Sequence, residues 1–184
     1  MHGINTILAV TGMPGSGKAT MCKILEERGI PRVVMGDIVR EETLKRGMEP
    51  TPENVGIVML DLRKRHGQDV IANRVVKKLK RLKQDLVVVD GIRSVAEVKA
   101  FRAHHANTIL IAIHASPQAR FDRLRRRGRT DDSKDWDTFE WRDERELNVG
   151  IGSAIALADH MIVNDGSLAD LRRKVLFLAR RVSR

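Results

Sequence analysis

The sequence predicts an α/β protein in which a five-stranded parallel sheet carries helices on both faces. Two observations lead to this fold class. Five short runs of β-branched and aliphatic residues occur along the chain, and longer segments with apolar residues at helical spacing lie between them. Strands that alternate with helices in this way pair in parallel, because a crossover helix returns the chain to the same end of the sheet.

The pattern gives each element approximate bounds. The predicted strands are Thr6–Thr11, Arg32–Met35, Leu86–Val89, Thr108–Ile113 and Met161–Val163, and the second of them has the weakest pattern. The predicted helices are Lys18–Glu27, Ile38–Arg46, Pro52–Arg65, Val70–Lys83, Val95–His104, Pro117–Arg127 and Leu168–Val182. Three helix starts follow residues suited to capping free amide groups, namely Asp37, Ser94 and Ser116.

Length and composition favour one domain over residues 1–184. With 184 residues and 42% hydrophobic content, the chain can bury a sizeable core. Cys22 is the only cysteine, so an intrachain disulfide is impossible, and the six histidines show no spacing that predicts a zinc site. The sequence contains neither a signal peptide nor an apolar run of membrane-spanning length, so we expect a cytoplasmic protein without membrane contact.

The formal net charge of +10 suits an anionic partner, which could be a nucleic acid, an anionic surface or a phosphorylated metabolite. Two basic segments, Arg74–Lys83 and Arg172–Arg184, also carry apolar residues at helical spacing, which indicates solvated helix faces. An aromatic content of only 3% leaves few platforms on which nucleic-acid bases could stack. A nucleic-acid-associated NTPase or nucleotide-dependent regulator is therefore an alternative rather than the first choice.

A glycine-rich loop between the first predicted strand and helix indicates a phosphate-binding site. Its glycines allow the backbone to turn around phosphates with N–H groups inward, and Lys18 adds a positive charge between the β- and γ-phosphates. The predicted contacts with ATP are Gly12, Met13, Pro14, Gly15, Ser16, Gly17, Lys18, Ala19 and Thr20. Because Ala19 occupies the usual place of the hydroxyl ligand to Mg²⁺, Thr20 becomes the candidate for that role.

With Ala19 and Thr20, this loop resembles the adenylate kinase version of the motif. Met35–Arg40 resembles the start of that family's acceptor-site helix, and Asp90–Arg93 resembles its segment with Asp-Gly and an arginine after a strand. The whole chain, including residues 158–167, also resembles archaeal proteins described as adenylate-kinase-related or dephospho-CoA-kinase-like. The resemblance implies a three-layer P-loop kinase fold with a small lid.

The same resemblance implies an acceptor-binding helical region at residues 36–83, in which Arg40 would contact the acceptor's phosphate together with Arg93. Asp90 ends a strand, where a carboxylate can hold Mg²⁺ or its waters. Asp37 could accept a proton from an acceptor hydroxyl or could cap the helix that begins at Ile38, and the sequence leaves both roles open.

An arginine-rich lid is expected at residues 120–146. Arginines that arrive as a flap closes can stabilise the migrating phosphoryl group and exclude water. The flap itself would be the polar loop Gly128–Asp137, and the catalytic candidates around it are Arg123, Arg127, Arg142 and Arg145. The last two are expected on a further helix beyond the flap, one turn apart on the same face. The remaining arginines of the predicted helix end are expected on a solvated face, namely Arg120, Arg125, Arg126 and Arg129.

By resemblance, the backbone around Asn164 and Gly166 lies beside the adenine of ATP. Together these features predict an Mg²⁺- and ATP-dependent phosphotransferase that acts on a small phosphorylated acceptor. A nucleoside monophosphate is the first choice of acceptor. Dephospho-CoA is the alternative, in which the acceptor group is a ribose hydroxyl.

Overall fold

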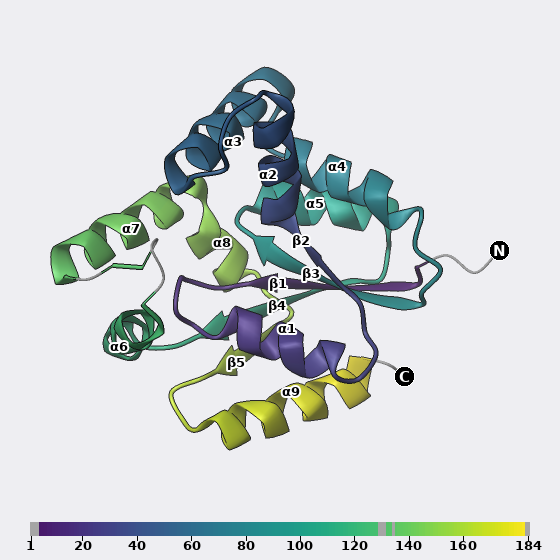
Figure 1. Cartoon of the computed structure of the whole chain (residues 1–184). Helices are drawn as coiled ribbons and strands as arrows, with labels where there is room; N and C mark the ends of the chain where they lie inside the picture. Colours follow the sequence, from purple (N-terminus) through teal and green to yellow (C-terminus); the bar gives the residue numbers. More distant parts are fainter. Residues whose placement is uncertain (1–3, 129–131, 134, 183–184) are drawn as a thin grey trace.

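The computed structural model describes residues 4–128, 132–133 and 135–182, and in these ranges the chain forms five strands and nine helices (Figure 1). The strands are β1 (Thr6–Thr11), β2 (Arg32–Val34), β3 (Leu86–Ile92), β4 (Thr108–His114) and β5 (His160–Val163). The helices are α1 (Lys18–Glu26), α2 (Met35–Lys45), α3 (Pro52–His66), α4 (Val70–Leu79), α5 (Val95–His104), α6 (Pro117–Arg127), α7 (Trp136–Val149), α8 (Ile151–Ala156) and α9 (Leu168–Val182).

All neighbouring strands pair in parallel in the order β2-β3-β1-β4-β5, which confirms the predicted sheet. The central strand β1 places Val10 opposite Asp90 of β3 on one side and Ile111 of β4 on the other. At the end of β1, the Thr11 hydroxyl donates a hydrogen bond of 2.8 Å to the Ile92 carbonyl. The carboxyl ends of the three central strands are therefore held side by side.

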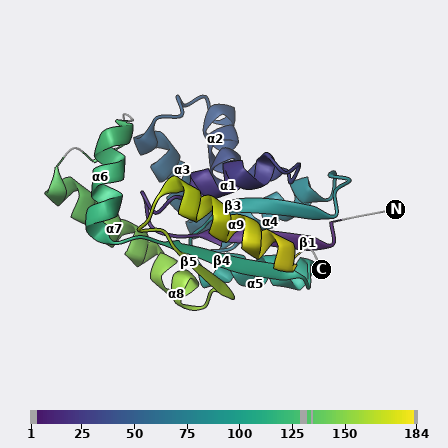
Figure 2. The same ribbon diagram turned by 90° about the horizontal axis from the view of Figure 1, so that it is seen from below.

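Helices cover both faces of the sheet and give three layers. Along β1, Ile7 and Ala9 pack in the core beneath α2, α3, α4, α5 and α8, while Leu8 and Val10 pack against α1 and α9. Figure 1 shows α1 and α9 below the sheet, and Figure 2 shows the same two helices in front of the strands. Because both faces of β1 are buried, its apolar run is continuous.

The start of α2 differs from the sequence prediction. The helix begins at Met35 rather than at Ile38, so β2 ends at Val34 and Asp37 lies in the first helical turn. The capping position belongs to Val34, which supplies no side-chain hydrogen bond, and the Asp37 carboxylate pairs with Arg40 instead. The expectation that Asp37 caps this helix was therefore wrong.

Two other helix starts agree with the prediction, whereas the end of one helix does not. Ser94 and Ser116 cap α5 and α6 as predicted. Their hydroxyls accept hydrogen bonds from the backbone N–H groups of Glu97 and Ala119, each three residues further along the chain. Helix α4 ends at Leu79 rather than at Lys83, because the backbone then closes a turn in which the Leu82 N–H bonds to the Leu79 carbonyl at 2.9 Å.

Within the described ranges, no helix combines the length and the apolar character needed to cross a lipid bilayer.

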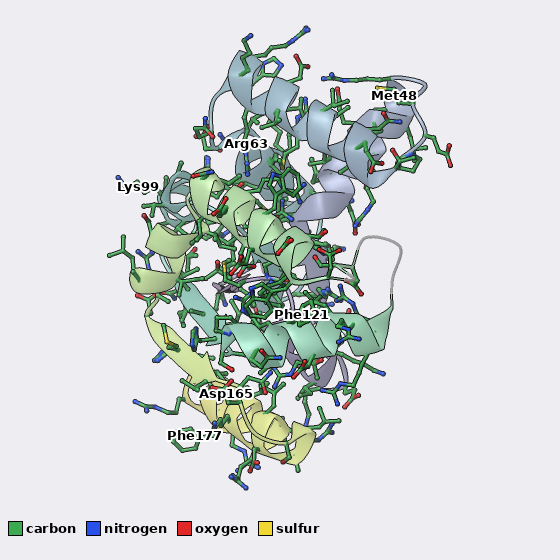
Figure 3. The ribbon with its side chains drawn as sticks, turned by 90° about the vertical axis from the view of Figure 1, so that its left-hand side faces the viewer. Met48, Arg63, Lys99, Phe121, Asp165 and Phe177 are labelled. Carbon is green, nitrogen blue, oxygen red and sulfur yellow. The ribbon has the colours of Figure 1, made fainter. Side chains whose placement is uncertain are left out.

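The predicted loop Gly128–Asp137 is shorter than expected, because α7 already begins at Trp136. Residues 129–131 and 134 of this loop, and with them the arginine at 129, lie outside the described residues. Helices α6 and α7 share a small apolar cluster of Phe121, Leu124 and Phe139, separate from the two cores of the sheet. In Figure 3, Phe121 marks the place where α6 faces α7.

Candidate functional site

The loop after β1 has a backbone that only glycine adopts readily. Gly12, Gly15 and Gly17 have φ angles of +146°, +80° and +111°. A Cβ atom on Gly12 would lie 2.3 Å from the Ile113 carbonyl oxygen, and one on Gly15 would lie 2.7 Å from the Arg120 carbonyl oxygen. The loop is therefore pressed against the end of β4 and the start of α6, with no room for side chains.

Asn164, at the end of β5, supports this loop from the opposite side. Its side-chain amide donates to the Ser16 carbonyl at 2.7 Å, and a Cβ atom on Gly17 would lie 2.3 Å from the same amide nitrogen. Its own backbone N–H bonds to the His114 carbonyl at 2.7 Å. Gly166, two residues later, is exposed. The buried side chain of Asn164 thus has a role in holding the loop that the sequence did not indicate.

Lys18 lies at the end of the loop with its ammonium over the backbone. Nζ donates to the Gly12 carbonyl at 2.5 Å and to the Met13 carbonyl at 3.1 Å. Burial lowers the pKa of Lys18 to about 8, and the nearby Asp90 carboxylate partly opposes this shift. The lysine is therefore a poorly hydrated charge held only by backbone carbonyl acceptors, a position in which a bound anion would stabilise it.

The loop opens onto a cavity of about 490 Å³. Most of the predicted site residues line it, namely Gly12, Pro14, Gly15, Gly17, Lys18, Ala19, Thr20, Asp90, Arg93, Arg123, Arg127 and Arg142. The other predicted residues do not line it, namely Met13, Ser16, Asp37, Arg40, Arg145, Asn164 and Gly166. Arg32, Glu146 and Ile151 also contribute to the wall, and the sequence prediction did not include them.

Asp90 is buried at the end of the cavity nearest β2, where its carboxylate forms an ion pair with Arg32. The parallel register places Val34 beside Asp90, so Arg32 lies two residues earlier on the neighbouring strand and on the same face of the sheet. A basic residue at that spacing on the preceding strand was the signal that could have predicted the pair.

Arg93 reaches the cavity from the segment after β3. Its Nε lies 3.4 Å from the buried carboxylate of Glu146 on α7, and its Nη1 contacts the Met59 sulfur at 3.7 Å. Its backbone N–H donates to Glu97 at 2.7 Å, and Glu97 is itself in a buried ion pair with Arg63 at 2.8 Å. The position of Arg93 is therefore set by α3, α5 and α7 together.

Asp37 and Arg40 are not brought to the cavity. Their side chains pair with each other at 2.5 Å, and each is about half exposed, at 51% and 54%. Their expected roles toward an acceptor therefore stay predictions, and the structure assigns them only an exposed ion pair on α2.

Three of the four predicted lid arginines face the cavity. Arg123 donates to the Asn164 carbonyl at 2.6 Å, which joins α6 to the segment that supports the loop. Arg127 forms a two-pronged ion pair with Asp132, and Arg142 approaches the same carboxylate at 3.8 Å. With its side chain only 2% exposed, Asp132 holds arginines of α6 and α7 at one wall of the cavity.

The other two arginines of interest differ from the prediction. Arg145 lies over the Trp141 ring at 5.2 Å with a side chain 54% exposed, away from the cavity. Arg120, expected on a solvated face, is buried, and its guanidinium binds both oxygens of Asp143 at 2.8 and 2.5 Å. That expectation was wrong because the first turn of α6 packs directly against the loop.

The site fits a nucleotide phosphate chain. The three loop glycines leave no space for side chains, the charged Lys18 is poorly hydrated, and the buried Ser16 hydroxyl finds no hydrogen-bond partner among the described residues. Thr20 and Asp90 offer the hard oxygen donors that Mg²⁺ prefers. Within the described ranges, no group of three or more acidic, histidine or cysteine side chains could hold a metal alone. Mg²⁺ would accordingly be shared with phosphate oxygens and water.

Comparison with known proteins supports a nucleotide-binding domain. The family model of an AAA domain matches residues 11–140. A UPF0200 protein of Thermococcus gammatolerans is 49% identical over 182 residues, covering 97% of this chain and 96% of the relative. A UPF0200 protein of Hyperthermus butylicus is 46% identical and covers 96% of this chain and 95% of the relative.

Solved structures share the fold at low sequence identity. TT1252 from Thermus thermophilus superposes with a TM-score of 0.65 at 20% identity and covers 98% of both chains. A shikimate kinase from Bacteroides thetaiotaomicron gives 0.65 at 13% identity and covers 97% of this chain and 99% of its own. A gluconokinase from Sinorhizobium meliloti gives 0.61 at 17% identity, with coverage of 98% and 95%. These likenesses show the fold alone.

Proposed function

Because the chain belongs to the UPF0200 family and has the fold of small P-loop kinases, we propose that it is an ATP-dependent phosphotransferase acting on a small phosphorylated acceptor. One observation carries the proposal. The loop lysine Lys18, the strand-end carboxylate Asp90 and three arginines from α6 and α7 line the same cavity. These are the kinds of charged group that phosphoryl transfer requires around a nucleoside triphosphate.

In the proposed reaction, an acceptor oxygen forms a bond to the γ-phosphorus while the bond to the β,γ-bridging oxygen breaks and ADP leaves. Protein groups contribute position and charge rather than covalent chemistry. Backbone N–H groups of the loop bind the β-phosphate region, Lys18 binds between the β- and γ-phosphates, and Arg123 reaches the charge that spreads over the migrating group. Mg²⁺, held with Thr20 and Asp90, would neutralise charge on the phosphate oxygens.

The acceptor is proposed to be a nucleoside monophosphate, and the support comes from the acidic side chains of the cavity. Among the described lining residues, only Asp90 and Glu146 are carboxylates, and each is paired with an arginine, Arg32 and Arg93 respectively. Neither is placed as a free general base. A phosphate acceptor is already ionised near neutral pH and needs no base, whereas a ribose hydroxyl must lose a proton.

Arg93 is the proposed ligand of the acceptor's phosphate, since its guanidinium lines the cavity on the side away from α6. Arg40 would join it only if α2 moved toward the loop. Such closure of a flanking segment over a bound acceptor is common among enzymes that must exclude water.

A coupled assay that measures ADP release with ATP, Mg²⁺ and a panel of nucleoside monophosphates tests the proposal. We expect turnover of at least one of them, and a loss of about a hundredfold or more in Lys18→Ala. The exposed Lys23→Ala on α1 serves as the matched control. Turnover of dephospho-CoA alone would identify the other acceptor. Tight RNA binding that falls steeply with salt, without any turnover, would support the nucleic-acid alternative.

A further inference from the structure

Helix α7 is attached to the rest of the molecule through few buried groups. Of its fourteen residues, only Phe139 and Glu146 are buried. Phe139 packs with Phe121 and Leu124 of α6 in the small apolar cluster between the two helices, and Trp136 joins the same aromatic contact. Apolar burial is non-directional, so a cluster of this size constrains the separation of α6 and α7 more than the rotation or sliding of α7.

The Arg120–Asp143 ion pair adds a directional contact of closer geometry than those of Arg142 with Asp132 at 3.8 Å and of Glu146 with Arg93 at 3.4 Å. Both guanidinium nitrogens of the fork bind the carboxylate, and the guanidinium carbon lies 4.8 Å from the centroid of the Phe139 ring. A bidentate pair constrains the plane and the angle of both groups, which a single contact does not. The side chains are only 5% and 16% exposed, so water does not compete effectively for either charge.

Arg120 also reaches the phosphate loop itself. Its Nη1 donates to the Pro14 carbonyl at 3.2 Å, and its own carbonyl oxygen lies only 2.7 Å from where a Cβ atom on Gly15 would be. One buried side chain therefore contacts the loop and α7 together. On α7, Arg142 is adjacent to Asp143, and Glu146 follows one turn later; both line the cavity.

We propose that Arg120 and Asp143 form a positioning pair that fixes α7 against the phosphate loop and so sets where Arg142 and Glu146 stand in the cavity. Neither residue of the pair lines the cavity, so the pair acts through its neighbours. A shift of α7 that broke the fork would move Arg142 with it, and misplacement of a charged group by about 1 Å can lower turnover a hundredfold.

The inference can be tested with Asp143→Asn, which removes the charge at nearly constant volume. Glu144→Gln is the matched control, because it makes the same charge change on an exposed position of the same helix. Asp143→Glu keeps the carboxylate and should recover most of what Asp143→Asn loses. Arg120→Lys keeps the buried charge without the fork, so it tests the pair even if Asp143→Asn does not fold.

Two readouts separate positioning from stability. The first readout is kinetic, and it alone rests on the proposed function. Asp143→Asn and Arg120→Lys should lower kcat about tenfold to a hundredfold and change KM for ATP less than threefold. The second is acrylamide quenching of tryptophan fluorescence, because both tryptophans of the chain, Trp136 and Trp141, lie on α7. Quenching should increase in both variants and stay at the wild-type level in Glu144→Gln.

Kinetics and quenching indistinguishable from Glu144→Gln in either variant would overturn the inference. So would a parallel loss of kcat, of affinity for a non-hydrolysable ATP analogue and of thermal stability, since that pattern describes a merely structural pair. If the wild-type protein turned over no acceptor, the proposed function would fail by itself. The quenching experiment and the analogue affinity would still decide the positioning role.

Discussion

The low pKa of Lys18 leads to a prediction about pH and nucleotide affinity. The protonated lysine binds phosphate, and in the free protein burial lowers its pKa to about 8. As the pH rises through 8, the free protein loses the charged form that binds the ligand. Bound phosphates stabilise the ammonium, so the complex should keep its proton to a higher pH and ATP affinity should fall as the pH increases.

The magnitude follows from the ionised fraction. With a pKa of about 8, roughly nine tenths of Lys18 is charged at pH 7 and about one tenth at pH 9. If the bound lysine remains charged at pH 9, the apparent affinity for ATP should decrease about tenfold between these two values. Binding at pH 9 should also take up close to one proton for each ATP bound.

Isothermal titration calorimetry at pH 7, 8 and 9, in buffers of different ionisation enthalpy, measures both quantities. Lys18→Met should bind more weakly and show neither the proton uptake nor the pH dependence. Lys23→Met, changed on the exposed face of the same helix, should keep both. A wild-type affinity that stays constant from pH 7 to pH 9, or a decrease of the same size in Lys18→Met, would refute the reasoning.

Three further variants and one control variant test the packing around the site. Gly17→Ala should abolish ATP binding, since its Cβ would lie 2.3 Å from the Asn164 amide at a φ of +111°; Gly29→Ala, with φ +78° and open space, should only lower the free energy of unfolding by about 1 kcal/mol. Calorimetric titration and thermal melts distinguish these effects. Asn164→Ala should weaken ATP binding more than it lowers the melting temperature, and equal binding to wild type would contradict its supporting role. Glu97→Gln should cost about 3–5 kcal/mol in urea unfolding, because it leaves Arg63 charged and buried; a cost below 1 kcal/mol would contradict this.

The sheet could be predicted because its signal is local and repeated. Each central strand is an apolar run bounded by polar residues, and α5 and α6 begin where Ser94 and Ser116 cap them. Helix α7 gave a weaker signal, enough to predict a helix around Arg142 and Arg145 but not its bounds. Its buried face consists of Phe139 and Glu146, so its sequence lacks the apolar periodicity from which bounds are predicted.

The phosphate loop could be predicted for the same reason, since its glycines and Lys18 are contiguous in the sequence. The ion pairs that surround it join residues far apart in the sequence, so they have no such contiguous signal. Arg32 and Asp90 are 58 residues apart, and Arg120 and Asp143 are 23 apart. Only tertiary packing separates the buried Arg120 from the exposed Arg125 and Arg126 on the same helix, because all three have the same local composition.

The charge of the cavity indicates which property of the ligand the site recognises. Among the described lining residues, six are cationic and two are carboxylates, so the wall carries an excess of positive charge in a partly buried space. In the free protein the carboxylates relieve part of the repulsion, as the pairs of Asp90 with Arg32 and of Glu146 with Arg93 show, and Asp132 behind the wall relieves a further part by pairing with Arg127. A ligand with several negative charges removes the remaining repulsion, and one phosphate group alone would not suffice. A triphosphate together with an acceptor phosphate matches this excess better than a neutral sugar or alcohol does, which is the electrostatic reason to prefer a nucleoside monophosphate.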